Sequence, residues 1–307
     1  MNKLASGFFA IAGLGCGLAS AFAQDADPAL VEQARLLSEP RSQATFIRQC
    51  TVEPARFPGL GDGVAAVPAK LFDNLYYVGR TDVGAWVIKT SAGLVLIDTL
   101  YTPKDAAQII DGGLRKLGLD PADIKIVFVT HFHGDHAGGV PYFREKGMRV
   151  MLSESDWSQL GGAPAADSIA HDGQTIMVGD TPFTVVLTPG HTPGAISLIF
   201  PVVENGVQHK AVIMELSPRG GIDVHRQAVA GIAHLAEFTG REGVDVALHP
   251  HEMIFDPAAR DFIMSASTRT AGSVNPLVIG KQSMQRFARM VGTCWQARIA
   301  TMEAAPK

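Results

Sequence analysis

Four side chains able to bind a metal ion fall within six residues of this chain, at His131, His133, Asp135 and His136. The apolar, β-branched run at 124–130 directly before them predicts a buried strand. The cluster therefore follows the end of a strand, where a loop can direct several side chains at one point. Neutral imidazole suits zinc, and a carboxylate can complete or bridge such a site. The alternative, a histidine-rich surface loop, is disfavoured by two further histidine segments downstream.

These two later segments supply the remaining ligands that a two-ion centre needs. His191 lies in a rigid Thr-Pro-Gly-His-Thr-Pro-Gly run, and His249 and His251 follow the last apolar strand-like stretch. The first two histidines of the cluster are two residues apart on an extended turn, so they point to the same side and can share one ion with His191. Asp135 and His136 then face a second ion, which either His249 or His251 can complete.

The sequence HFHGDH resembles the HxHxDH signature of the metallo-β-lactamase-fold hydrolases, and the resemblance continues through the segments around His191 and His251. It extends from about Leu71 to the C-terminus and is strongest for the third subclass of metallo-β-lactamases. The resemblance implies an α/β fold, a four-layer αβ/βα sandwich, with two zinc ions, although such sites accept other divalent ions too. The family's spacing after Asp245 favours His251 as the last ligand and gives His249 a supporting or structural place.

The chemistry that this resemblance implies is hydrolysis by a hydroxide shared between two metal ions. Two ions lower the pKa of water enough to generate that hydroxide near neutral pH. Asp135 is the expected catalytic residue, because it can orient the hydroxide and relay its proton. Neither a Gly-x-Ser-x-Gly elbow nor a Ser-x-x-Lys motif is found in the sequence. We therefore expect opening of a cyclic amide, as in a β-lactam, with ester, lactone or thioester hydrolysis as the alternative.

Two departures from the third subclass bear on the substrate. Glu215 stands where that subclass has a serine, and where lactonase- and thioesterase-like members carry a carboxylate that bridges both metals. It can be an additional ligand, an ion-pair partner of Arg219 or a partly exposed loop residue. Ser217 and Arg219 can hold a substrate carboxylate. His191 follows His136 by only 55 positions, a short interval for this subclass, which weakens the transfer of lactamase activity.

The resemblance also bears on the cysteines Cys50 and Cys294, which remain once residues 1–23 are set aside. The third subclass often joins its C-terminal helix by a disulfide to the segment before the last metal ligand. Cys294 matches the helix end of that bridge, but Val244 stands at the partner position. Cys50 is then the available partner, and an oxidising compartment permits the bond.

Residues 1–23 predict a secretory signal peptide. Lys3 precedes a run of small and apolar residues, and Ala21-Phe22-Ala23 supplies small residues around a cleavage point before Gln24. The alternative is an uncleaved membrane anchor, which the abundance of Gly and Ala disfavours. We expect a periplasmic or secreted bacterial protein without a membrane anchor after cleavage.

Composition sets the remaining limits. The 307 residues are 47% hydrophobic and 18% charged, enough for one sizeable core. A net charge of −4 gives no reason to expect a nucleic-acid partner, so the expected partner is a small-molecule substrate. The sequence carries no signal for an oligomeric state. We predict an N-terminal arm at 24–70, rich in Pro and Gly towards its end, and a single catalytic domain at 71–307.

Strands and helices alternate through the catalytic domain, which is the pattern of an α/β protein. Expected strands lie at 71–78, 85–90, 94–98, 124–130, 149–152, 174–178, 183–188, 195–200, 210–214 and 244–248. Expected helices lie at 28–37, 103–117, 139–146, 154–160, 224–238, 257–267 and 282–302. Asp98 ends its strand at a loop and can support the metal site. Solvated or packing places are expected for His171, His209, His225, His234, Trp86, Trp157 and Trp295.

Overall fold

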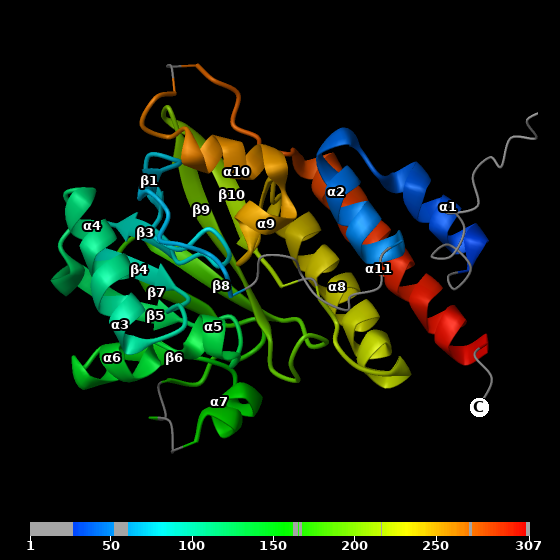
Figure 1. The fold of residues 1–307 in the computed structure, drawn as a ribbon, viewed down its shortest axis with the longest axis horizontal. Helices are drawn as coiled ribbons and strands as arrows, with labels where there is room; N and C mark the ends of the chain where they lie inside the picture. The colour runs from blue at the N-terminus through cyan, green and yellow to red at the C-terminus, as the bar shows by residue number, and fades with distance from the viewer. Residues whose placement is uncertain are drawn as a thin grey trace, which may run out of the picture.

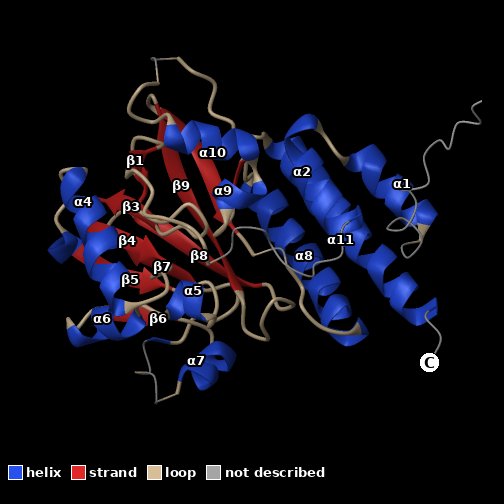
Figure 2. Cartoon of the chain, viewed as in Figure 1, coloured by secondary structure: helices blue, strands red, loops and turns tan. Residues whose placement is uncertain are grey.

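The computed structural model describes residues 27–51, 61–161, 165, 168–215, 217–269 and 272–304. The predicted signal peptide and residues 52–60 lie outside them. Two β-sheets stack face to face, and helices cover the outer face of each sheet (Figures 1 and 2). This is the α/β sandwich of four layers that the resemblance noted in the sequence implies. Within the described residues, no helix combines the length and the apolar character needed to cross a bilayer.

The first sheet has six strands in the order in which they occur along the chain. The pairs from β1 to β4 are antiparallel, while β4, β5 and β6 run parallel. Parallel neighbours require a crossover, and helices α3 to α6 supply it on the outer face. The strands are β1 Ala69–Lys70, β2 Leu75–Tyr77, β3 Trp86–Thr90, β4 Gly93–Ile97, β5 Ile124–Phe128 and β6 Arg149–Met151. The helices are α3 Pro103–Asp105, continued by a π-helical segment Ala106–Asp111, α4 Gly112–Lys116, α5 Gly134–Ala137 and α6 Val140–Glu145.

The second sheet has five strands in the order β11-β10-β9-β8-β7. Hairpins join β7 to β10 in antiparallel fashion, and the long helix α8 crosses over to place β11 parallel to β10. The strands are β7 Thr175–Val178, β8 Thr181–Leu187, β9 Ile196–Glu204, β10 Val207–Ile213 and β11 Val246–Leu248. The helices that follow β6 are α7 Glu154–Leu160, α8 Ile222–Glu242, α9 Glu252–Phe255, α10 Pro257–Met264 and α11 Lys281–Ala304.

The strands are apolar on both faces because three cores separate the four layers. In β3, Trp86 and Ile88 pack between the sheets, whereas Val87 packs against the outer helices. A third core lies between the second sheet and helices α8 and α11, and it includes Val212 and Met290. Side chains that alternate between two buried faces leave no polar face, so these strands appear in the sequence as continuous apolar runs.

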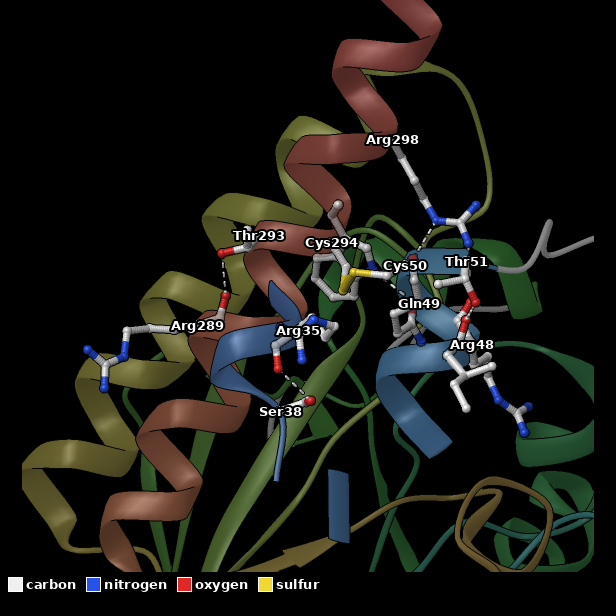
Figure 3. The surroundings of a disulfide bond; sticks show 12 residues. Arg35, Ser38, Arg48, Gln49, Cys50, Thr51, Arg289, Thr293, Cys294 and Arg298 are labelled. Carbon is white, nitrogen blue, oxygen red and sulfur yellow. Dashed lines mark hydrogen bonds between the residues drawn. A yellow bond between two sulfur atoms is a disulfide. The ribbon is translucent and has the colours of Figure 1, made fainter. Parts of the chain in front are cut away.

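An N-terminal arm packs against the last helix. It consists of α1 Pro28–Leu37, α2 Gln43–Phe46 and a π-helical turn Ile47–Thr51, and α1 lies alongside α11 (Figure 1). The disulfide between Cys50 and Cys294 joins arm and helix, so Cys294 is paired with the partner that the sequence left available (Figure 3). Around it, the Trp295 indole donates to the Gln49 side chain at 2.9 Å and Arg298 donates to the Gln49 carbonyl at 2.7 Å.

Several predicted boundaries were wrong for identifiable reasons. The strand expected at 71–78 is interrupted, because the amides of Leu71 and Phe72 both donate to the carbonyl of Leu75 and turn the chain. β9 continues past the expected end at Phe200 to Glu204, where it pairs with Val207 across the hairpin. The helix expected at 224–238 is longer, since it ends at a left-handed Gly243, a residue suited to that conformation.

Candidate metal centre

Three loops meet at one edge of the sandwich, after β5, between β8 and β9, and after β11. They bring two sets of ligand-type side chains together, with the potential donor atoms of each set within 4.8 Å of one another. The first set is His131, His133 and His191, and the second is Asp135, His136 and His251. A third group, made of His131, His136 and Glu215, connects the two.

Ring nitrogens converge closely within each set. The Nδ1 atom of His133 lies 2.9 Å from Nε2 of His191, and the Nε2 atoms of His136 and His251 lie 3.1 Å apart. Asp135 completes the second set, with Oδ2 3.3 Å from Nε2 of His136 and 3.5 Å from Nε2 of His251. All six residues named from the sequence as ligands therefore lie in one cluster.

Hydrogen bonds on the outer side of three rings determine which nitrogen carries the proton. Nδ1 of His136 faces the Asp98 carboxylate at 2.8 Å, Nδ1 of His251 faces the Asp82 carbonyl at 2.7 Å, and Nδ1 of His191 faces the Ser217 carbonyl. An oxygen that only accepts requires a proton on the facing nitrogen, so in the neutral form of each ring the Nε2 lone pair points towards the other ligands. Inward lone pairs opposite outward N–H groups are the arrangement that a divalent metal needs, so these residues fit such an ion.

His131 fits the same pattern from the centre of the cluster. It is fully buried, and its Nδ1 contacts the Thr130 hydroxyl at 3.1 Å. Its Nε2 is buried and has no hydrogen-bond partner among the residues that the structure describes. A buried polar atom without a partner is costly, and coordination of an ion would satisfy it.

Asp98 supports the second set, as its position at a strand end predicts. Its carboxylate accepts from the Thr130 amide at 2.7 Å and from the Thr130 hydroxyl, and it also binds His136. Asp98 and Leu100 adopt positive φ angles of 65° and 63°. Such a backbone is unfavourable for residues other than glycine and persists only where surrounding contacts hold it in place.

The pKa values in the pocket are displaced in opposite directions. Burial, and then the neighbouring histidines, lower the pKa of His131 well below its ordinary value; burial and His191 lower that of His133 to about 4. For His136, burial alone would lower the pKa, but the carboxylates of Asp135 and Asp98 outweigh it and raise the pKa to about 10. Burial would raise the pKa of Asp135, but the neighbouring His136 and His251 hold it below its ordinary value. Binding of a metal by His136 therefore displaces a proton.

Glu215 is a buried residue with an exposed fraction of 6%, so of the three alternatives considered from the sequence the partly exposed loop glutamate is wrong. Its Oε1 lies 3.9 Å from Nδ1 of His191 and 3.7 Å from Nε2 of His249. Although burial would raise its pKa, the surrounding histidines lower it, so the carboxylate is ionised. The placement suits the expectation of an additional metal ligand.

Ser217 and Arg219, which follow Glu215 in the same loop, differ in the exposure of their side chains. The backbone carbonyl of Ser217 orients His191, while its hydroxyl is buried and without a hydrogen-bond partner in the described part of the chain. Arg219 is exposed. Of the two side chains proposed to hold a substrate carboxylate, only that of Arg219 is presented to solvent.

The choice between His249 and His251 follows from one backbone amide. The amide of His251 donates to Nδ1 of His249 at 2.9 Å, so the neutral His249 ring carries its proton on Nε2. That nitrogen faces Glu215, and the ring stacks on Phe255 with centroids 4.1 Å apart. His249 therefore holds the His251 backbone in place, whereas Nε2 of His251 is free to bind a metal.

Asp82 is a residue of the centre that the sequence reasoning missed. Its carbonyl orients His251, and its buried carboxylate accepts from the Tyr101 hydroxyl at 2.8 Å and from the Gly61 amide at 2.9 Å. The residue belongs to no motif, and it lies 169 positions from His251. Only the fold brings the two together.

The remaining histidines and tryptophans occupy packing or surface places, as expected. His209 binds Asp245 at 2.8 Å, His234 binds Asp172 at 3.0 Å, and His225 faces the Gly221 carbonyl at 3.2 Å. His171 is exposed, and all three tryptophans are buried, Trp86, Trp157 and Trp295.

Comparison with known proteins places this centre in context. The family model of the metallo-beta-lactamase superfamily matches residues 78–203, which include the ligands from His131 to His191. The crystal structure of BJP-1, a subclass B3 metallo-beta-lactamase of Bradyrhizobium japonicum, is 25% identical, with a TM-score of 0.62 over 78% of this chain and 96% of that one. MEM-A1, a subclass B3 enzyme from a soil metagenome library, is 26% identical, with a TM-score of 0.61 over 78% and 98%. FEZ-1 from Legionella gormanii, at 22% identity and a TM-score of 0.66 over 79% and 99%, shares the fold.

Proposed function

Since the chain contains a metallo-beta-lactamase superfamily domain and is a metal-dependent hydrolase, we propose that it opens the cyclic amide of β-lactams. The observation that carries the proposal is the convergence of the two ligand sets at one edge of the sandwich. The solved structures that resemble the chain at 25% and 26% identity are described as subclass B3 metallo-beta-lactamases, which supports this substrate. Such an activity in the periplasm would protect a bacterium from β-lactam antibiotics.

We propose zinc as the metal, in two positions. Imidazole nitrogen with carboxylate oxygen is a common donor set for zinc, although iron and manganese accept it as well. The set of His131, His133 and His191 would hold one ion, and the set of Asp135, His136 and His251 the other. When bound, the pair of ions supplies Lewis acidity, which acidifies water and polarises the substrate carbonyl.

The chain's own contribution to the reaction lies in Asp135. Its carboxylate is ionised, because nearby histidines hold its pKa low, so it can orient water and accept its proton at Oδ. Attack by that water forms a C–O bond at the carbonyl carbon and breaks the C–N bond of the ring. The proton held by Asp135 then passes to the departing nitrogen, which restores the carboxylate.

The first test is a substrate panel run on metal-quantified mature protein. We expect the two-zinc protein to hydrolyse a carbapenem or a cephalosporin, and the His131→Ala variant to lose that turnover. The same zinc determination on both proteins shows whether loss of activity follows loss of metal. Turnover no greater than that of the variant across a broad lactam panel would remove the lactamase assignment.

A second candidate activity is hydrolysis of an ester, lactone or thioester, and the buried Glu215 favours it. An ionised carboxylate beside the ligands adds one negative charge to the pocket, which weakens attraction for the carboxylate that β-lactams carry. Substrates without a carboxylate are not repelled by the charge of Glu215. Turnover of an acyl-homoserine lactone without any lactam turnover would favour this activity. Stoichiometric zinc with no hydrolysis of lactams or chromogenic esters would instead indicate a metal-binding protein without catalysis.

A further inference from the structure

One buried carboxylate outside the ligand set connects two of the loops that carry the ligands. Asp156 lies in α7 and is fully buried. Its Oδ2 accepts from the Phe132 amide at 2.9 Å and from the Thr192 hydroxyl at 2.8 Å, and its Oδ1 accepts from the Gly194 amide at 2.8 Å. Sequence motifs did not single out this residue.

Two of the three donors lie next to ligands of the first set in the sequence. Phe132 stands between His131 and His133, and Thr192 directly follows His191. The carboxylate therefore joins the loop after β5 to the loop before β9 at positions adjacent to all three ligands. More than 50 residues separate the two loops in sequence, and besides this carboxylate the Ile196 amide joins them by donating to the Thr130 carbonyl at 2.9 Å.

The chemistry of the bonds requires a carboxylate. An ionised aspartate only accepts, so both of its oxygens can serve N–H and O–H donors at once. An asparagine of the same shape would turn its NH₂ group towards at least one of these donors. The approach is also close, since a Cβ atom at Gly194 would collide with Asp156 and Ser153. The surroundings of Asp156 therefore require both an acceptor-only side chain at position 156 and a glycine at position 194.

We propose that Asp156 is a positioning residue that sets the separation of His133 and His191 and thereby the affinity of the first metal position. The role rests on the proposed function, because it presumes that the first ligand set binds a metal. Asp98 offers the contrast, since its carboxylate binds Thr130 and His136 and so acts mainly on the second set. Each metal position then depends on a different buried carboxylate.

The test measures zinc affinity at each position separately, by competition with a chromophoric chelator on protein first freed of metal. In a His251→Ala background the first set remains, and in a His191→Ala background the second set remains. We expect Asp156→Asn to weaken zinc binding about 10- to 100-fold in the first background and to change it little in the second. A general loss of structure would weaken both.

Asp111→Asn is the matched control for burial. Asp111 is also a buried carboxylate on the outer side of the first sheet, where it accepts from the Tyr142 hydroxyl at 2.6 Å and from Lys146 at 2.8 Å. Neither of these partners lies in a ligand loop. We expect Asp111→Asn to lower the free energy of unfolding and to leave zinc affinity unchanged in both backgrounds.

A milder pair of variants covers the case in which Asp156→Asn does not fold. Thr192→Val removes one of the three donors and should weaken zinc at the first position, while Thr192→Ser keeps the hydroxyl and should not. Wild-type affinity in both Asp156→Asn and Thr192→Val, or equal losses in the two backgrounds, would overturn the positioning role. An unmodified protein that binds no zinc would refute the proposed function, and this role with it.

Discussion

At the scale of single residues, the protonation of each ring follows from its outer hydrogen bond. Oxygen acceptors behind His136, His191 and His251 place the Nε2 lone pair of each neutral ring towards the other ligands, whereas the amide donor behind His249 places the proton of that ring on Nε2. The same residue type, two positions apart in one loop, is thereby given opposite roles. Identical side chains differ in chemistry because the groups behind them differ.

Glu252 gives a residue-scale prediction about pH. Burial, with a further contribution from Asp256, raises its pKa to about 8 from the ordinary 4.5. Since the folded value is the higher one, the neutral carboxyl stabilises the fold fully below about pH 4.5, and this contribution is lost as the pH rises to about 8. We expect Glu252→Gln to remove this fall in the free energy of unfolding.

The measurement is urea unfolding of metal-free wild type and Glu252→Gln across that pH range. The glutamine keeps an oxygen that can accept from the His249 amide, as Glu252 does, so the variant isolates the proton. Stability curves that run parallel through the range would contradict the prediction.

Site residues close together in the sequence could be predicted, whereas those placed by contacts between distant segments could not. The cluster from His131 to His136 is compact, so spacing alone could name it. The burial of Glu215 and the part played by Asp82 depend on contacts between distant segments, and neither residue type nor spacing encodes those. The family's spacing after Asp245 favoured His251 over His249 as the ligand, but the reason for the difference, the hydrogen bond from the His251 amide to Nδ1 of His249, is not displayed by the sequence.

At the scale of elements, each ligand loop follows a strand whose side chains are buried on both faces. Such strands are held firmly by the cores, so the loops at their ends start from fixed points. The apolar runs made these strands predictable. Their ends were less so, because turns such as the one at Leu71 and Phe72 are set by hydrogen bonds rather than by apolar pattern.

The disulfide gives the element-scale prediction. Cys50 and Cys294 join the arm to α11 across 244 positions, so Cys50→Ser should lower the free energy of unfolding by about 2–5 kcal/mol. Denaturant unfolding measures the loss. Cys294→Ser and the double variant should lose the same amount, because all three remove one bond. We expect zinc affinity to stay as in wild type, and full stability in any of the three would refute the prediction.

At the scale of the whole molecule, the fold class could be predicted because several signals agreed. Alternating strands and helices indicated an α/β protein, and the resemblance of the three histidine segments to the metallo-β-lactamase-fold hydrolases implied the sandwich. The packing of the arm on α11 could not be derived from its own composition, because it depends on a surface that exists only after the second sheet and α8 are assembled.

Export is the prediction that concerns the whole chain. We propose cleavage after Ala23 and release into the periplasm, which suits the Cys50–Cys294 disulfide since such bonds persist in oxidising compartments. Mass spectrometry of a periplasmic extract should find a mature N-terminus at Gln24. An Ala23→Trp variant should remain uncleaved, because the cleavage site requires small residues. A chain retained in the membrane fraction with Met1 intact would contradict this.

The ligand loops belong to different halves of the sandwich, and this has a consequence for assembly. His131 to His136 follow the first sheet, whereas His191 and His251 follow strands of the second. Neither half alone offers a complete set of donors to an ion. An ion would therefore be fully coordinated only when the two halves have packed together correctly. Metal binding would then favour the correctly folded protein in addition to enabling catalysis.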